Sequence, residues 1–352
     1  MALSTKHILC LLCGAATLAG CCLIDEDLTE CETDYEIRYE IRLVTNRNAE
    51  LETRLGTPAD APAAAALRAG LEDVFSDYAH DLDLRFYDVI RDEAAGDSLR
   101  RHHGRHNLDG SEGVFTFFLP VREYMHLAAA NVEGNGAVQL EEAAGRCHTA
   151  RLVQAVRDTV PSHRNALFTA RLPMNNIRGD ESQRFDASLY MANCASALVV
   201  DTLNSHIRKL DVYAMGFATG FNLCDSSYVF SYTPYMKPER LDIPGTGNVG
   251  YLTVHFPSRD FRSGTRSVEE TEAPFLAESA PDPLWRYLVY ATLPDGTITA
   301  TRLNVYQPIR AGQLRIIKVK LKGDGSGESD DATVGVSVTL DWSPGMDIDI
   351  EL

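Results

Sequence analysis

Apolar and polar residues alternate one by one in the stretch that follows Asp34. From Tyr35 to Leu43 the odd positions hold tyrosine, isoleucine or leucine, and the even positions hold glutamate or arginine. A period of two is typical of a β-strand that buries one face. The charges on the other face alternate in sign and can pair there. The sequence therefore predicts a half-buried strand at the start of the folded chain.

Short apolar runs bounded by turn residues recur along the rest of the chain. They predict strands at 82–86, 114–119, 124–130, 166–172, 205–215, 228–232, 249–256, 285–292, 297–305, 313–321 and 334–342. The run at 185–200 fits a strand or a partly helical segment. The clearest hairpin lies at 285–305, because Asp295-Gly296 supplies the positive φ that a tight turn needs.

Helical spacing occurs in two places. Between Ala61 and His80 apolar residues recur at intervals of three and four, and Asp60 and Pro62 suit the start of a helix. We expect an amphipathic helix there, lying on the surface of a domain. The stretch 139–160 also has mixed helical spacing. By contrast, 92–113 is polar and rich in glycine, arginine and histidine, which predicts a loop.

The pattern as a whole favours a mainly β fold of two tandem β-sandwich domains with a few inserted helices. The 352 residues suffice for two domains of ordinary size. A polar segment at 173–183 separates the two halves. We therefore expect an N-terminal domain at 35–180 and a C-terminal domain at 181–352.

The last seven residues alternate again. Met346, Ile348, Ile350 and Leu352 are apolar, and acidic residues separate them. One interpretation is a final edge strand of the second domain. The other is a free strand that completes the sheet of another subunit, with backbone hydrogen bonds giving affinity and alternate side chains giving register.

The first residues have the composition of an export signal. A short apolar run follows Lys6 and ends in Leu18-Ala19-Gly20-Cys21, which is typical of a secretory signal peptide and matches the bacterial lipobox. This resemblance implies cleavage of a signal at 1–20, acylation of Cys21 and a lipidated tether at 21–34. Two or three acyl chains anchor a protein stably in a membrane. An ordinary cleaved signal with a chance cysteine is the alternative.

The net charge and the motifs in the sequence argue against two classes of function, nucleic-acid binding and catalysis. The sequence has 50 acidic and 33 basic residues, a formal net charge of −17, which argues against nucleic acid as a partner. It contains no nucleophile elbow, phosphate loop or zinc-protease helix. We therefore expect no enzymatic activity and no cofactor.

Two polar stretches offer candidate metal ligands. His102, His103 and His106 could gather around a metal, but flanking arginines oppose a bound cation. The acidic residues from Asp324 to Asp331 could ligate Ca²⁺, but their spacing does not fit an EF-hand. We expect both stretches to be solvated loops without metal.

Five cysteines follow Cys21. They are widely and irregularly spaced, at Cys22, Cys31, Cys147, Cys194 and Cys224. This spacing is not that of a disulfide framework.

The segment Cys21-Cys22-Leu23-Ile24-Asp25-Glu26-Asp27-Leu28-Thr29-Glu30-Cys31 resembles the start of the FimB-like, fimbrillin-associated anchor lipoproteins of Bacteroidales. In these a lipidated cysteine is soon followed by an acidic segment and a second cysteine. The stretches 81–84, 124–131 and 334–342 are compatible with the same family.

This resemblance implies two transthyretin-like β-sandwich domains, no catalysis and a role at the base of a type V pilus. It implies a pilus or fimbrial stalk subunit as partner and a surface-facing position on the outer membrane. An anchor must keep its lipidated N-terminus, so the bonds after Arg38, Arg42 and Arg47 have to resist arginine-specific proteases. A predicted strand at Arg38 and Arg42 would protect them.

A surface lipoprotein that binds glycans is the alternative function. Such sites usually present exposed aromatic side chains. Trp285 and Trp342 occupy strand positions that we expect to face the core, which weakens this alternative.

Overall fold

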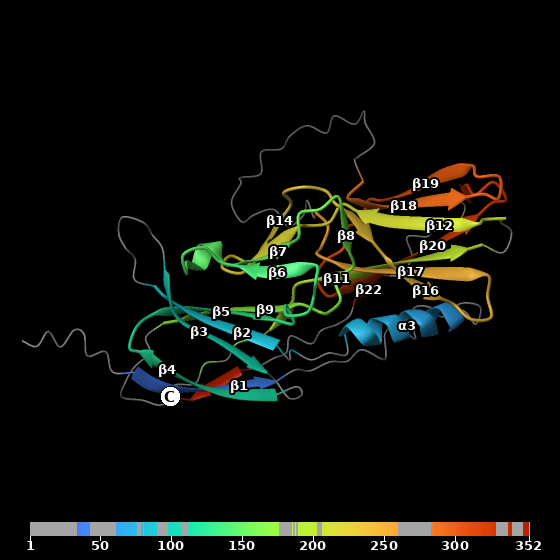
Figure 1. Ribbon diagram of the computed structural model, residues 1–352. Coiled ribbons are helices and arrows are strands. Elements are labelled where there is room, and N and C mark those ends of the chain that lie inside the picture. The colour runs from blue at the N-terminus through green and yellow to red at the C-terminus, as the bar shows by residue number, and fades with distance from the viewer. Residues whose placement is uncertain are drawn as a thin grey trace, which may run out of the picture.

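The computed structural model describes residues 34–42, 61–75, 79, 81–89, 98–107, 112–175, 185, 187, 189–202, 206–259, 283–328, 337–339 and 348–351. In this part of the chain the strands form five sheets, and one long helix lies against them (Figure 1). The prediction of a mainly β fold with β-sandwich layers is confirmed.

Two sheets form the lower left of Figure 1. The first has the order β23 (Ile348–Glu351), β1 (Asp34–Arg42), β4 (Glu112–Pro120). The second has the order β10 (Tyr190–Met191), β9 (Phe168–Met174), β5 (Tyr124–Ala130), β2 (Asp81–Asp88), β3 (Leu99–Asn107).

A small sheet covers the other side of the β5 sheet. Its order is β14 (Ser227–Val229), β13 (Gly220–Asn222), β7 (Arg151–Gln154), β6 (Val138–Glu141). A short 3-10 helix, η4 (Cys147–Thr149), joins β6 to β7.

The remaining two sheets pack face to face at the right of Figure 1. One has the order β19 (Ile298–Val305), β18 (Trp285–Thr292), β12 (Lys209–Met215), β15 (Tyr235–Lys237), β8 (Thr159–Pro161). The other has the order β16 (Glu239–Asp242), β17 (Asn248–His255), β11 (Cys194–Asp201), β20 (Gln313–Leu321), β21 (Gly327–Glu328), and β22 (Ser337–Thr339) also pairs with β20.

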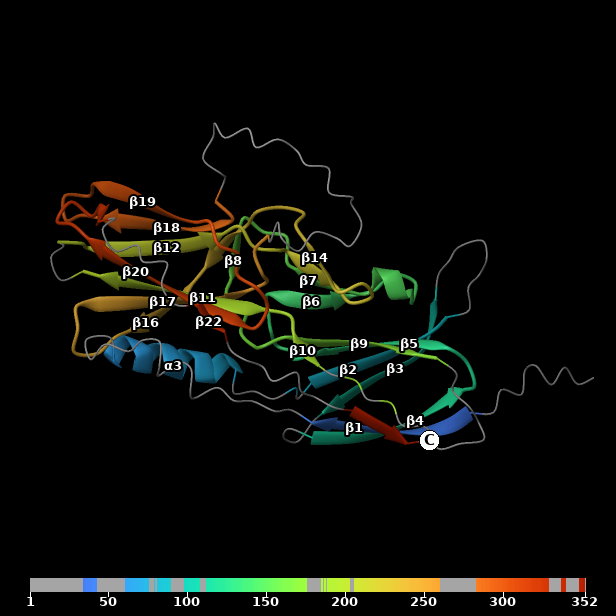
Figure 2. The same cartoon turned by 180° about the vertical axis from the view of Figure 1, so that it is seen from behind.

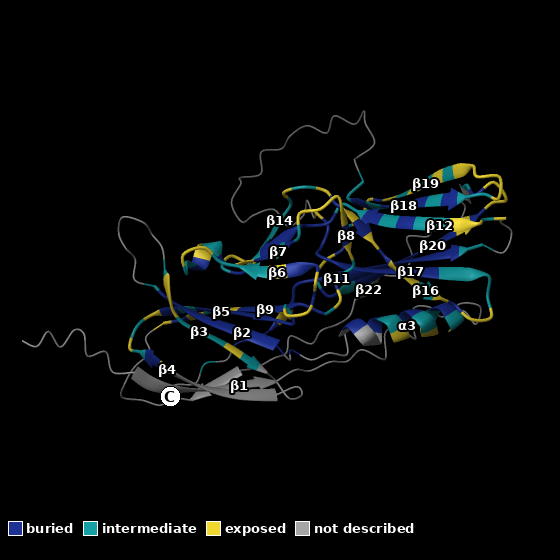
Figure 3. Ribbon diagram, viewed as in Figure 1, coloured by how far each residue is buried: buried dark blue, intermediate teal, exposed yellow. Residues whose placement is uncertain are grey.

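The β5 and β11 sheets form the middle layer, which both views show between other layers (Figures 1 and 2). Along β11, Ala195, Ala197 and Val199 join one apolar core, and Leu198 and Val200 join the other. Figure 3 shows β2, β5 and β11 buried along almost their whole length. A strand buried on both faces reads as a continuous apolar run, which explains the ambiguity of 185–200 in the sequence.

Helix α3 (Ala61–Phe75) covers the lower face of the β11 sheet. Leu67 and Leu71 are buried in the same core as Ile243 and Leu252. The predicted helix is therefore confirmed over 61–75, and its apolar stripe faces strands from the second half of the chain. Within the described residues no helix is long and apolar enough to cross a membrane.

The hairpin predicted at 285–305 is confirmed. β18 and β19 pair in register from Trp285 with Val305 to Thr292 with Ile298. Gly296 closes the turn with a φ of 89°, a conformation that favours glycine.

Two predictions were wrong. The stretch 92–113 contains the strand β3, which pairs with β2 and places His102, Gly104 and His106 opposite Phe86, Leu84 and Leu82. Its polar composition reflects an edge position, where one backbone edge has no neighbour among the described strands.

The stretch 139–160 forms short strands instead of a helix, because its apolar positions belong to separate strands that happen to be three or four residues apart.

Strands from both halves of the sequence share sheets. β8 pairs in parallel with β15, and β7 pairs with β13. The boundary at residue 180 stays a prediction, but four pairings among the described strands cross it, since β10 also pairs with β9 and β23 pairs with β1.

Candidate assembly site

The C-terminal strand lies beside the N-terminal strand. β23 pairs antiparallel with β1 through four residue pairs, and β4 pairs with β1 through nine, from Asp34 with Pro120 to Arg42 with Glu112. Figure 1 shows the C-terminus next to β1 and β4. The two ends of the described chain therefore meet in one sheet.

The register locates two of the predicted donor-strand residues. Ile348 lies opposite Ile41, and Ile350 lies opposite Tyr39. Met346 and Leu352 lie outside the described residues, as does the predicted lipidation site Cys21. In the structure the neighbour of the tail is β1, a strand of the first half of the same chain, and not a strand of the second half. Pairing with another subunit stays a prediction.

The charges in this register favour the pairing at one position and oppose it at another. Arg38 lies opposite Glu351, whereas Glu40 lies opposite Asp349. Opposite charges at facing positions stabilise an antiparallel pair, and like charges weaken it, by roughly 0.2–1 kcal/mol each. In the described residues β23 shares four pairs with β1, fewer than the nine that β4 shares with it.

Arg38 and Arg42 lie inside β1, as predicted. Arg38 is paired on both sides, with Thr116 of β4 and Glu351 of β23. Arg42 is paired with Glu112. A protease must bind its substrate as an extended free strand, so this pairing protects the bond after Arg38. Arg47 lies outside the described residues.

A buried charged cluster on β2 was not foreseen. Arg85 donates from Nε to Asp83 Oδ1 at 2.7 Å and from Nη1 to Glu142 Oε2. Tyr87 donates to Glu142 Oε1 at 3.0 Å, and Arg100 lies 3.0 Å from Glu142 Oε2. Burial alone would lower the pKa of Arg85, but the hydrogen bond and charge of Asp83 raise it overall. The cluster ties the middle layer to the segment that follows β6.

The sequence pattern here is the same as in a solvated strand, since Asp81, Asp83 and Arg85 alternate with apolar residues. All three charged residues are nevertheless buried. They line a cavity of about 290 Å³ together with His103 and others. His103 Nε2 lies 2.8 Å from Asp83 Oδ2. Because a second sheet packs over this face of β2, the charged residues are buried instead of solvated.

Replacing Arg85 by methionine is expected to destabilise the fold by about 3 kcal/mol or more, because Asp83 and Glu142 lose a buried partner. Urea unfolding measures this. Arg105→Met is the matched control, since Arg105 and Glu133 are 57% and 63% exposed and such pairs contribute at most about 1 kcal/mol. Equal effects of the two changes would contradict the role given to Arg85.

A serine–histidine pair lies in the core between the two right-hand sheets. His255 Nε2 lies 2.9 Å from Ser196 Oγ, and Tyr287 donates to the same oxygen at 2.8 Å. Burial lowers the pKa of His255 to about 3, so the ring is neutral. None of the three residues is exposed to solvent, and no substrate can reach them. The arrangement satisfies buried polar atoms.

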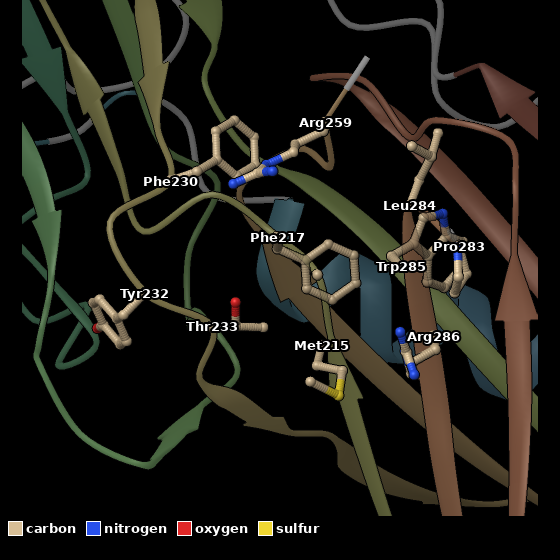
Figure 4. A pocket seen from close by; sticks show the side chains of 11 residues that line it. Met215, Phe217, Phe230, Tyr232, Thr233, Arg259, Pro283, Leu284, Trp285 and Arg286 are labelled. Atoms are coloured by element: carbon tan, nitrogen blue, oxygen red, sulfur yellow. The ribbon is translucent and has the colours of Figure 1, made fainter. Parts of the chain in front are cut away.

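A pocket with a volume of about 450 Å³ lies beside β18 (Figure 4). Trp285 and Phe217 form its floor and are 1% and 3% exposed. The Trp285 indole donates to the Gln307 carbonyl at 3.0 Å. The burial of Trp285 confirms its predicted core orientation, whereas Trp342 lies outside the described residues. Above them Arg259 lies over the Phe230 ring at 5.2 Å.

Two stretches offered candidate metal ligands in the sequence, and Asp330 and Asp331 of the second lie outside the described residues. Among the described residues no group of three or more histidine, cysteine, aspartate or glutamate side chains could hold a metal. Burial lowers the pKa of both His102 and His106. Asp324 accepts from the Ser326 amide at 2.9 Å and from its hydroxyl at 2.6 Å. Asp324 therefore shapes a turn.

Comparison by sequence finds no matching family model and no matching characterised protein. Comparison by structure finds the fimbrial anchor protein Mfa2 of Porphyromonas gingivalis, with a TM-score of 0.45, 10% identity, and coverage of 74% of this chain and 91% of that one. It also finds the tip fimbrial protein Mfa3 of the same organism, with a TM-score of 0.35, 10% identity, and coverage of 81% of this chain and 96% of that one.

A protein of Bacteroides thetaiotaomicron to which polysaccharide binding is ascribed is similar at a TM-score of 0.47 and 11% identity, over 75% of this chain and 88% of that one. The fimbrial structures are of the class that the N-terminal resemblance names. At this level of similarity the function has to be argued from the residues of this chain.

Proposed function

We propose that this protein is a non-catalytic lipoprotein of the outer membrane that faces the cell surface and attaches a pilus or fimbria to the cell. The N-terminal signal and Cys21 would fix it to the membrane. Its C-terminal strand would then join the sheet of the basal stalk subunit by β-strand addition. The observation that carries the proposal is the position of β23 as an edge strand, held by few pairs.

The pairing of β1 favours different roles for the two ends of the chain: the N-terminal end stays fixed, and the C-terminal tail can move to a partner. β1 is held to β4 by nine residue pairs and to β23 by four. The tail can therefore leave β1 without releasing the strand that follows the tether. In the assembled state, load from the fibre would pass through the fold to β1 and from there to Cys21.

Glu40 and Asp349 lie opposite each other, and two acidic residues at facing positions favour release of the tail from β1. A stalk subunit that presents a neutral or basic residue at that position would pair with the tail more strongly than β1 does. Exchange between a weaker pairing within the chain and a stronger one with a partner explains how the strand stays protected before assembly.

Changing Asp349 to lysine is expected to strengthen the pairing with β1 and to reduce capture of the stalk subunit by roughly twofold to fivefold. Asp349→Asn, which removes the repulsion without adding an attraction, should have a smaller effect. A pull-down of the intact lipoprotein from membranes, with bound subunits identified, measures this. Undiminished capture by the lysine variant would contradict a competition between β1 and the partner.

Binding of an acidic glycan at the pocket of Figure 4 is the second candidate function. Arg259 is exposed and stacks on Phe230, and Arg286 lies in the same pocket. A carboxylated sugar could pair with the two guanidinium groups. A glycan array separates the two functions, because saturable binding that Arg259→Ala abolishes would favour the glycan site.

A further inference from the structure

Two cysteines that are far apart in the sequence lie together in the fold. The sulfurs of Cys147 and Cys224 are 2.8 Å apart, although 77 positions separate the residues. Cys147 begins η4, and Cys224 follows β13. A disulfide has an S–S distance of about 2.05 Å, so the sulfurs need to approach by less than about 1 Å.

The backbone around the two cysteines is already fixed by hydrogen bonds. β7 and β13 pair through Leu152 and Phe221, and the Leu223 amide donates to the Ala150 carbonyl at 3.0 Å. The side chains therefore lie side by side because the sheet places them there. Cys194 belongs to the same apolar core as Cys147, but its sulfur contacts His255.

We propose that Cys147 and Cys224 form a disulfide in the exported protein, which clips the β13–β14 hairpin onto β6 and β7. The inference rests on the export in the proposed function, because disulfides persist in oxidising compartments outside the cytoplasm. The bond would close a chain segment that crosses residue 180 and would hold together a sheet made from both halves of the sequence.

The reaction is thiol–disulfide exchange with a small-molecule or protein disulfide as the oxidant. The Cys224 thiolate attacks one sulfur of the oxidant, and the first thiolate leaves. The Cys147 thiolate then attacks the Cys224 sulfur of the mixed disulfide, and the second thiolate leaves. One S–S bond forms in the protein, two protons and two electrons leave its thiols, and the oxidant is reduced to two thiols.

The exposure and the pKa of each thiol indicate that Cys224 reacts first and Cys147 second. Cys224 is partly exposed and Cys147 is buried, so an oxidant reaches Cys224 first. The hydrogen bond from Cys147, aided by the charge of Arg171, lowers the pKa of Cys224 to about 7. The hydrogen bond to Cys224 and burial raise the pKa of Cys147. A partly exposed thiol with a lowered pKa is the better nucleophile.

The test uses the full lipoprotein, isolated from membranes in detergent with free thiols blocked at lysis. Trypsin digestion without reduction should yield a cross-linked pair of peptides that contain Cys147 and Cys224, and reduction should separate them. The melting temperature should fall on the order of 10 °C on reduction. A Cys147→Ala/Cys224→Ala variant should melt near the reduced protein and ignore reductant, whereas Cys194→Ala should keep the reductant-dependent shift.

Recovery of both thiols blocked and unlinked would overturn the proposal. A second arm then identifies which part failed, by treating the reduced protein with oxidised glutathione. If the bond forms there, the geometry holds and the protein does not reach an oxidising compartment, which counts against the proposed function. If the bond does not form there either, the pairing of the two side chains is wrong and the proposed function is unaffected.

Discussion

Replacing Cys21 with alanine is expected to move the protein from the membrane fraction into the soluble fraction. The change removes the acceptor for the acyl chains, and each buried methylene contributes about 0.8 kcal/mol to membrane binding. The loss should therefore be nearly complete. Fractionation followed by immunoblotting measures it, and electron microscopy should show detached fimbriae in the medium.

Cys22→Ala is the matched control, because it changes the neighbouring cysteine and leaves the acyl acceptor in place. Its variant should stay in the membrane fraction. If Cys21→Ala also stays there, the lipidation hypothesis is wrong.

Deletion of Met346 to Leu352 is expected to reduce the number of fimbriae retained per cell on the order of tenfold. The deletion removes the strand that would pair with the stalk subunit, and an interface built on backbone pairing has no substitute for it. Counting fimbriae by electron microscopy, alongside immunoblots of the surface protein, separates loss of attachment from loss of the anchor.

A second variant keeps the length of the tail. Ile348→Asn/Ile350→Asn retains the backbone but removes the apolar residues at positions opposite Ile41 and Tyr39. It should also lose fimbriae, though less completely, because alternate side chains supply the register. Full retention in both variants would show that the tail does not hold the fibre.

The sequence predicted elements whose apolar pattern is local. The alternation in Asp34–Arg42, the Asp295-Gly296 hairpin and the stripe of α3 all appear in the structure. In each case the pattern within one short segment is enough to predict the element. The core orientation of Trp285 follows from the same rule.

The features that the sequence did not predict depend on contacts between distant segments. The charged face of β2 has the pattern of a solvated strand, but a second sheet packs over it, and Glu142 from the segment that follows β6 pairs with Arg85. The pairing of β23 with β1 joins opposite ends of the chain. The proximity of Cys147 and Cys224 follows from the pairing of β7 with β13. No local periodicity encodes any of these.

The central claim is that β23 leaves β1 to hold the fibre, and a reversible lock tests it most directly. Tyr39 and Ile350 lie opposite each other, so Tyr39→Cys/Ile350→Cys allows a disulfide that pins the tail to β1. Cells with the oxidised double variant should retain few fimbriae, reductant during assembly should restore them, and each single variant should retain the normal number throughout. Normal retention by cells in which the lock is fully formed would contradict the account.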